Sequence, residues 1–269
     1  MNRHAHTEKG KKNVMKILVV NDDGYRAEGI AALARILQNE HEVFVCAPKE
    51  NMSAVGHGLT IRRLLTVEKV ELPDCERISA YCVDGTPVDC VRMAIGNLGF
   101  IPDLVLSGIN QAPNLGTDII SSGTVAAAKE AAMLGYRAIA VSRDEFTTDY
   151  FDDVAEVFLE MLNTLLRCFD ESCKLLNVNF PFCPRGEYRG IRTGYLAEQV
   201  YPVAFDEVRC DDGVVRYKSN GKKLTVCSEE DTSDEKYVRD RFITVTPLKY
   251  DETHYKLLSE IKPVIERNF

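Results

Sequence analysis

Short apolar runs alternate with amphipathic stretches along the first part of the chain. Lys16–Val20 (KILVV) and Glu42–Ala47 (EVFVCA) are continuous apolar runs of strand length, typical of strands buried on both faces. Between them, Gly29–Glu40 carries apolar residues at positions i, i+3, i+4 and i+7, which predicts a helix with one face on a sheet. A strand, a helix and a strand in this order predict the βαβ unit of a parallel sheet.

The same alternation continues to about residue 183. Further buried strands are expected at Asp103–Ser107, Ala138–Ser142 and Leu175–Phe180. Further helices are expected from the capping pattern Thr86-Pro87-Val88-Asp89 to Ile95, after Ser121-Ser122-Gly123-Thr124, and over Phe151–Phe169. The segment after Pro48 is expected to be a loop before a short strand-like stretch. The pattern predicts an α/β fold with a mostly parallel sheet over residues 14–183, which form the catalytic core.

Beyond Pro184 the pattern changes to short segments of alternating polarity. VVRYKS and KLTVCS surround the turn signals Asp212-Gly213 and Asn220-Gly221, which predicts hairpins. Residues 184–246 are therefore expected to form a β-rich extension that serves oligomerisation. Within it, the acidic run Glu229–Glu235 is expected to be a solvated loop, because clustered carboxylates repel one another.

The two ends of the chain are expected to differ in order. Residues 1–13 are polar and basic and lack the apolar stretch of a secretory signal, which predicts a disordered arm. Arg241–Pro247 is expected to be a strand. Residues 247–269 are expected to hold a helix whose apolar residues share one side: Leu257, Leu258, Ile261 and Ile265. Residues 14–269 are thus expected to form a single domain.

Composition and charge exclude several classes of protein. No apolar run approaches the length that spans a bilayer, so no membrane contact is expected. A formal net charge of −8 repels a nucleic-acid polymer over most of the surface. The nine cysteines are an odd number without a C-x-x-C pair, which indicates reduced thiols in the cytoplasm. Cys46, Cys82 and Cys90 stand in apolar surroundings and are expected to be buried thiols.

Oxygen-bearing side chains follow three of the expected strands. Asp22 and Asp23 come after the first strand, Ser53 lies beyond the second, and Asn110 follows the third. Ligands of an open parallel sheet bind beyond the carboxyl ends of its strands, so we expect these residues to converge. Two carboxylates, a hydroxyl and an amide suit one Mg²⁺ or Mn²⁺ ion. Asp22-Asp23-Gly24 taken alone is also typical of a simple turn.

A phosphate site is expected at the start of the alanine-rich helix. Ser122, Gly123 and Thr124 offer hydroxyls and unpaired N–H groups at a helix N-terminus, where anions bind. Ordinary N-capping explains the same residues. Asn114, in the loop before them, is placed to donate to the same phosphate. Neither G-x-G-x-x-G nor G-x-x-x-x-G-K-[ST] occurs, so dinucleotide and nucleoside-triphosphate sites have no support.

His57 is a candidate catalytic acid. It lies four residues after Ser53 in a glycine-flanked loop, within reach of the same site, where it would donate a proton to the leaving group. The alternative is a loop histidine that makes a local hydrogen bond.

Five motifs occur in an order typical of one family: NDDG, SAVGHGLT, DGTPVDCV, SGINQAPNLG and SSGTVAAA. The chain resembles, from roughly Met15 to Thr253, the stationary-phase survival protein SurE family of 5′/3′-nucleotidases. The resemblance implies a Rossmann-like, three-layer α/β/α fold. It also implies a Mg²⁺- or Mn²⁺-dependent phosphomonoesterase for nucleoside 5′-monophosphates, with 3′-monophosphates and short polyphosphate as further substrates. Homodimers or homotetramers that exchange C-terminal elements and a β-hairpin are implied as well.

The family's site residues map onto the same motifs. The resemblance implies that one divalent ion per subunit binds Asp22, Asp23, Ser53 and Asn110. It implies a phosphate near Asn114, Ser122, Gly123 and Thr124, with Asn110 beside it. The chain departs from the family pattern in its N-terminal arm, in Lys129-Glu130-Ala131 and in the hairpin region, which leaves substrate preference and oligomeric state open.

The expected reaction is attack of an activated water on phosphorus, in line with the leaving group. Backbone N–H groups of Gly123 and Thr124 would stabilise the developing charge, and Asp22 or Asp23 would take the proton. An aspartyl-phosphate route is less favoured because the acids are adjacent. Two alternatives are a receiver-type signalling domain, which would need an aspartate where Asn110 stands, and a nucleotide-binding module without turnover.

Overall fold

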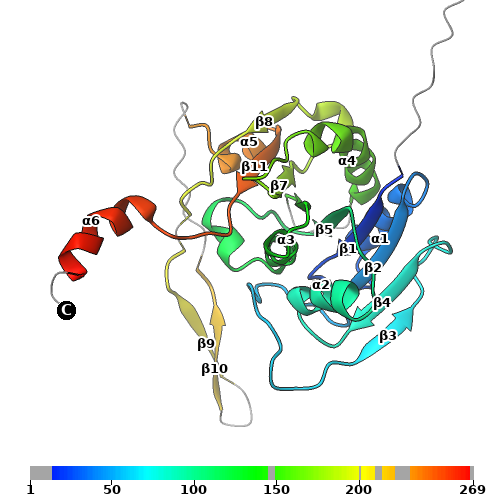
Figure 1. Ribbon diagram of the computed structural model, residues 1–269, viewed down its shortest axis with the longest axis horizontal. Coiled ribbons are helices and arrows are strands. Elements are labelled where there is room, and N and C mark those ends of the chain that lie inside the picture. Colours follow the sequence, from blue (N-terminus) through cyan, green and yellow to red (C-terminus); the bar gives the residue numbers. More distant parts are fainter. Residues whose placement is uncertain (1–13, 145–148, 200, 210–213, 222–230, 267–269) are drawn as a thin grey trace, which may run out of the picture.

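The computed structural model describes residues 14–144, 149–199, 201–209, 214–221 and 231–266 (Figure 1). The expected N-terminal arm and the segment KLTVCS lie outside these residues. No described helix combines the length and the hydropathy that crossing a membrane requires.

A nine-stranded sheet forms the centre of the molecule, in the order β3-β4-β2-β1-β5-β6-β7-β11-β8. Its strands are β1 (Lys16–Val20), β2 (Glu42–Pro48), β3 (Val67–Val70), β4 (Ser79–Val83), β5 (Leu104–Asn110), β6 (Ala138–Arg143), β7 (Leu175–Phe180), β8 (Ile191–Thr193) and β11 (Ile243–Leu248). Only the β3–β4 and β7–β11 pairs of this sheet are antiparallel in the described residues. The expected mostly parallel sheet is therefore confirmed.

Helices cover both faces of the sheet and complete three layers (Figure 1). They are α1 (Glu28–Leu37), α2 (Pro87–Gly96), α3 (Gly123–Met133) and α4 (Phe151–Leu166). Side chains alternate between the faces along β1. Ile17 and Val19 belong to the core cluster with α1 and α4, whereas Leu18 and Val20 belong to the cluster with α2 and α3. Both faces are buried, which explains why this strand is apolar without interruption.

The expected start of α2 is confirmed in detail. The Thr86 hydroxyl accepts a hydrogen bond from the Asp89 N–H at 3.1 Å, and the Asp89 carboxylate accepts one from the Thr86 N–H at 2.9 Å. This reciprocal pair is a capping box, with Pro87 at the first helical position.

The structure differs from the sequence prediction at three places. One short strand-like stretch was expected after the loop that follows β2, but the structure has two strands there, β3 and β4, and β3 is an edge strand whose VEKV sequence has no buried face. The strand β5 extends to Asn110 although Gly108 suggested an earlier end. The acidic run after Glu229 is not all solvated: Asp234 is fully buried and begins α5 (Asp234–Arg239).

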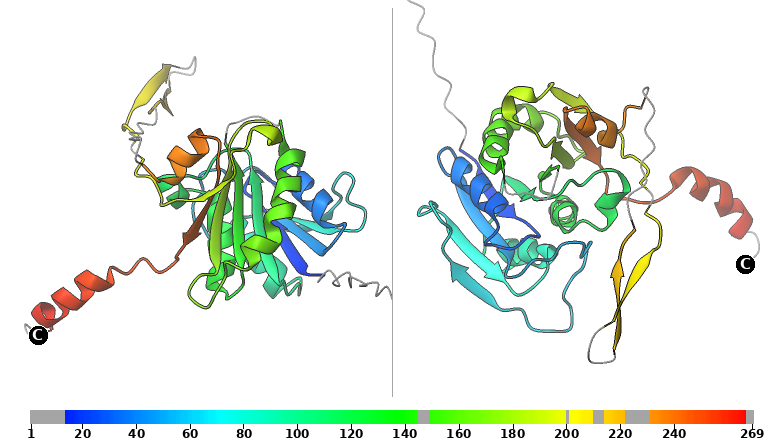
Figure 2. Two further views of the ribbon diagram at one scale, coloured as in Figure 1. Left: turned by 90° about the horizontal axis from the view of Figure 1, so that it is seen from above. Right: turned by 180° about the vertical axis from the view of Figure 1, so that it is seen from behind.

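Two elements extend away from the body of the molecule (Figures 1 and 2). One is the antiparallel hairpin of β9 (Phe205–Arg209) and β10 (Val215–Ser219), every residue of which is exposed. The other is α6 (Tyr255–Ile265), which has no buried residue. The antiparallel pairing of β9 with β10 and the helix α6 agree with the expected hairpin and C-terminal helix, whereas the turn signal Asp212-Gly213 lies outside the described residues. β8 and β11, by contrast, belong to the central sheet.

Candidate functional site

The loop after β1 is shaped by its own side chains. The Asn21 amide donates to the Gly24 carbonyl at 2.8 Å, and Gly24 adopts a φ of +98°, which favours glycine. The Tyr25 N–H donates to the Pro48 carbonyl at 2.9 Å, so the loop is tied to the end of β2. This turn leaves Asp22 3% exposed and Asp23 partly buried at the carboxyl edge of the sheet.

Asp22 is in direct contact with the first turn of α3. The Thr124 hydroxyl donates to Oδ1 of Asp22. A Cβ atom at Gly123 would lie 2.7 Å from Cβ of Asp22 and 2.9 Å from its Oδ2, closer than any side chain tolerates. Gly123 therefore permits a close approach between this helix and the carboxylate.

Asp23 is held by two other loops. The Asn51 amide donates to its Oδ1 at 3.4 Å, and the Gln111 N–H donates to its Oδ2 at 3.3 Å. The Asn51 side-chain oxygen also accepts the Ser53 N–H at 2.8 Å. Asn51 thus joins the acid pair to the loop that carries Ser53.

Asn110 ends β5 and is oriented by its amide nitrogen. That nitrogen donates to the Ala112 carbonyl at 2.7 Å, so the side-chain oxygen remains for a ligand. Four residues on, the Asn114 amide donates to the Ser142 hydroxyl at 2.7 Å, and its backbone N–H donates to the Asn179 side-chain oxygen at 2.8 Å. Amide groups of Asn177 and Asn179 donate to the Asn114 carbonyl. The loop is therefore fixed from the neighbouring strands β6 and β7.

These loops surround a cavity of about 290 Å³. The residues that line it are Asp22, Asp23, Asn51, Ser53, Ala54, Asn110, Gln111, Ala112, Asn114, Asp118, Ser121 and Ser122. Six of the expected site residues are among them: Asp22, Asp23, Ser53, Asn110, Asn114 and Ser122. Gly123 and Thr124 lie behind Asp22 and support it.

The electrostatics of the cavity suit a cation. Burial raises the pKa of Asp22 to about 6, with a smaller contribution in the same direction from the Asp23 charge and an opposing one from the Thr124 hydroxyl. Burial also raises the pKa of Asp23, against the hydrogen bonds from Gln111 and Asn51. The hydrogen bonds that the protein donates to these two carboxylates thus offset only part of the cost of burying their negative charge. Carboxylate, hydroxyl and amide oxygens are hard donors, and this donor set fits Mg²⁺ or Mn²⁺.

The four expected metal donors, which are Asp22, Asp23, Ser53 and Asn110, include only two carboxylates. In the described part of the chain, no group of three or more His, Cys, Asp or Glu side chains is arranged to hold a metal. A metal here would take its remaining ligands from neutral oxygens, water and substrate.

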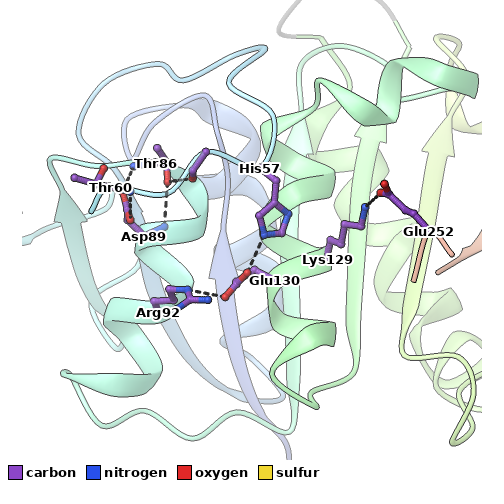
Figure 3. Close-up of polar contacts among 9 residues, drawn as sticks. His57, Thr60, Thr86, Asp89, Arg92, Lys129, Glu130 and Glu252 are labelled. Carbon is purple, nitrogen blue, oxygen red and sulfur yellow. Dashed lines mark hydrogen bonds and ion pairs between the residues drawn. The ribbon is translucent and has the colours of Figure 1, made fainter. Parts of the chain in front are cut away.

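His57 is not among the residues that line this cavity, and its side chain points to Glu130 instead (Figure 3). Its Nε2 is 2.8 Å from Oε2 of Glu130, a carboxylate on α3 that is 1% exposed. Oε1 of Glu130 is 2.6 Å from Nε of Arg92 on α2. The structure does not bring His57 to the acid pair, and its role as proton donor stays a prediction.

The lining residues that were not foreseen as site residues include Asn51, Gln111 and Asp118. Asn51 comes two residues before Ser53 and Gln111 directly follows Asn110, and this closeness in sequence to an expected ligand was the available signal. Asp118 had no such signal. It lies in the 3-10 helix η1 (Gly116–Ile120), and only the folding of the loop that contains this helix brings Asp118 to the cavity.

The chain matches known proteins over nearly its full length. The model of the family described as "Survival protein SurE" matches residues 17–202. The 5′-nucleotidase SurE of Alkaliphilus metalliredigens is 40% identical over 250 residues, which cover 92% of this chain and 98% of that protein. The 5′-nucleotidase SurE of Synechococcus elongatus is 39% identical over 254 residues, with the same coverage of 92% and 98%. The crystal structure of the SurE protein from Aquifex aeolicus superposes with a TM-score of 0.78 at 36% identity, covering 93% of this chain and 99% of that one.

Proposed function

The chain belongs to the SurE family, and from that premise we propose that it is a metal-dependent 5′-nucleotidase. It hydrolyses nucleoside monophosphates to nucleoside and phosphate. One observation carries this proposal: the loops after β1, β2 and β5 and the start of α3 supply an acid pair, a hydroxyl and an amide to one cavity. Such a cavity combines a cation site with a phosphate site.

The resident ion is proposed to be a single Mg²⁺ or Mn²⁺ held by Asp22, Asp23, Ser53 and Asn110. When bound, it supplies Lewis-acid polarisation of the phosphate and of the attacking water. A receiver-type domain is not favoured, because Asn110 ends β5 where a phosphoacceptor carboxylate would be required.

The protein's own groups are proposed to divide the remaining work. Asp22 or Asp23 accepts the proton of the attacking water, since both carboxylates face the cavity. Ser122, Asn114 and the N-terminus of α3 bind the phosphate oxygens, where the positive end of the helix dipole stabilises negative charge. Thr124 and Gly123 keep the Asp22 carboxylate in place.

Substrate range and compartment are also proposed. Nucleoside 5′-monophosphates are the main substrates, with 3′-monophosphates and short polyphosphate as further ones. A cytoplasmic location is supported by the free thiols of the seven described cysteines, as in a reducing compartment.

A homodimer or homotetramer is proposed from the two projecting elements. Leu257, Leu258 and Ile261 of α6 are 46%, 47% and 42% exposed, although they form one apolar side of the helix. An apolar helix face that the described part of the chain does not bury is typical of a surface that packs against another molecule. Sedimentation equilibrium tests this assembly, and a monomer at micromolar concentration would contradict it.

The proposed activity is tested by phosphate release from AMP with Mg²⁺ or Mn²⁺. Asp22→Asn and Asp23→Asn are expected to lower kcat/KM by roughly a hundredfold or more while circular dichroism stays unchanged. Glu71→Gln, which removes an exposed carboxylate beyond β3, is the matched control and should keep wild-type activity. Wild-type turnover by both folded aspartate variants would overturn the proposal.

A further inference from the structure

The proposed chemistry assigns no role to one carboxylate of the cavity, Asp118. Asp118 is half-buried, whereas Asp22 is 3% exposed, so Asp118 is the more accessible of these two lining residues. The Ser121 N–H donates to the Asp118 carbonyl at 3.1 Å, which places Asp118 one turn before the proposed phosphate residue Ser122. Asp118 and the proposed phosphate residue Ser122 therefore line the same cavity from neighbouring positions of one turn.

Tyr201 orients this carboxylate. Its hydroxyl donates to Oδ2 of Asp118 at 2.7 Å. Among the described residues, no side chain or N–H group donates to Oδ1, and no Lys, Arg or His forms an ion pair with Asp118. One carboxylate oxygen is thus held by the protein while the other can accept hydrogen bonds from a ligand.

The turn that carries Asp118 is hydrogen-bonded to the residues that come shortly before Tyr201 in the chain. The Thr117 N–H donates to the Ala197 carbonyl at 3.0 Å, and the Thr117 hydroxyl donates to the Gln199 carbonyl at 3.1 Å. The buried Asp234 carboxylate accepts the Gly116 N–H at 2.9 Å and the Ala197 N–H at 3.0 Å. These hydrogen bonds hold the turn of Asp118 against residues 197–199, immediately before the segment in which Tyr201 lies.

The chemistry of a negative group at this position limits what it can bind. A carboxylate repels the phosphate of the substrate, so phosphate recognition is excluded as its purpose. It accepts hydrogen bonds well from hydroxyl groups, and a vicinal diol offers two donors to one carboxylate. In a nucleoside 5′-monophosphate, the ribose lies between the phosphate and the base and carries such a diol.

We propose that Asp118, oriented by Tyr201, accepts hydrogen bonds from the ribose hydroxyls of the substrate and makes this enzyme selective for ribonucleotides. This inference rests on the proposed nucleotidase function and adds the sugar to it. Hydrogen bonds from ribose hydroxyls to a carboxylate strengthen substrate binding without changing the reaction at phosphorus. The selectivity is therefore independent of the base.

The test compares AMP with 2′,3′-dideoxyadenosine 5′-monophosphate, which has the same phosphate and base but no ribose hydroxyls. The wild-type enzyme is expected to show a kcat/KM about tenfold higher for AMP, the size of effect typical of hydrogen bonds to a charged group. Asp118→Ala should reduce this ratio to near one, mainly through the KM for AMP. Tyr201→Phe keeps the ring and should reduce the ratio partly, whereas the control Glu71→Gln should not alter it.

Each outcome of this comparison either supports or overturns the inference. If Asp118→Ala keeps the wild-type ratio, or lowers kcat/KM equally for both substrates, Asp118 does not recognise the sugar and this inference is overturned. In that case turnover of AMP by the wild-type enzyme leaves the proposed nucleotidase function intact. If the wild-type enzyme releases no phosphate from either nucleotide, the proposed function itself fails, and the ribose inference with it. Turnover of p-nitrophenyl phosphate would then show that the protein is folded and is another phosphomonoesterase.

Discussion

The imidazole Nε2 of His57 lies 2.8 Å from Oε2 of Glu130, and this contact joins the loop after β2 to the third turn of α3 (Figure 3). The loop makes a second contact with the same helix region, because the Gly56 N–H donates to the Ser121 carbonyl at 2.9 Å. Since this loop also carries Asn51 and Ser53, its position on α3 fixes the distance between the proposed metal and phosphate residues.

We expect Glu130→Ala to be destabilising. The substitution removes the buried carboxylate that Arg92 and His57 both contact, and because water can solvate these partly exposed partners, we expect a cost of about 1 to 2 kcal/mol. Urea denaturation measures the loss in the free energy of unfolding. His57→Ala should cost less, because the His57 side chain is 34% exposed. An equal cost for both variants would contradict this order.

His57→Ala also separates the two roles considered for this histidine. A proton donor matters for the poor leaving group of AMP and little for the good leaving group of p-nitrophenyl phosphate. Because His57 lies outside the cavity, we expect similar losses of kcat on both substrates. A loss confined to AMP would instead support the role of a catalytic acid.

Gly123→Ala tests the close approach of α3 to Asp22. A Cβ atom here would lie 2.7 Å from Cβ of Asp22, so the carboxylate must move, and kcat/KM for AMP is expected to fall on the order of a hundredfold. Gly96→Ala in α2 is the matched control, because nothing lies within 4 Å of its Cβ position. The control should keep its activity and gain up to about 1 kcal/mol of stability. If Gly123→Ala and Gly96→Ala had the same activity, the close approach of α3 to Asp22 would be refuted.

Thr124→Val removes the hydroxyl that donates to Asp22 at nearly constant side-chain volume. Loss of a hydrogen bond that supports a metal-binding carboxylate is expected to raise the Kd for Mn²⁺ by roughly tenfold. Thr124→Ser keeps the hydroxyl and should bind the ion nearly as well as the wild type. Isothermal titration calorimetry with Mn²⁺ alone measures both constants, and identical values for the valine and serine variants would contradict the proposed support.

The cysteines are expected to differ in reactivity. Burial raises the pKa of Cys90 well above its ordinary value and raises that of Cys82. A raised thiol pKa reduces the thiolate fraction at any pH below it, and the thiolate is the species that is alkylated. At pH 8, iodoacetamide should modify the exposed Cys168 and leave Cys82 and Cys90 unmodified in the folded protein. Peptide mass spectrometry measures this, and labelling of Cys90 before Cys168 would refute it.

Local patterns were sufficient for most elements of the core and for the ligand loops. Continuous apolar runs such as KILVV reveal buried strands because each strand is covered on both faces. The position of Asp22-Asp23 after such a strand then predicted the edge of the sheet at which ligands gather. The edge strand β3 was missed because it is exposed and carries charged residues, so no burial pattern marks it.

The sequence by itself determined the α/β core and the capping box of α2, because apolar runs and capping residues are local features of the chain. It also predicted that Asp22, Asp23, Ser53 and Asn110 converge, since each follows a strand of one parallel sheet. Only the tertiary structure decided that His57 contacts Glu130, 73 residues away. It also decided that Asp118 enters the cavity beside Tyr201, 83 residues away. Contacts over such separations depend on how loops pack across strands, and no periodicity along the chain records that packing.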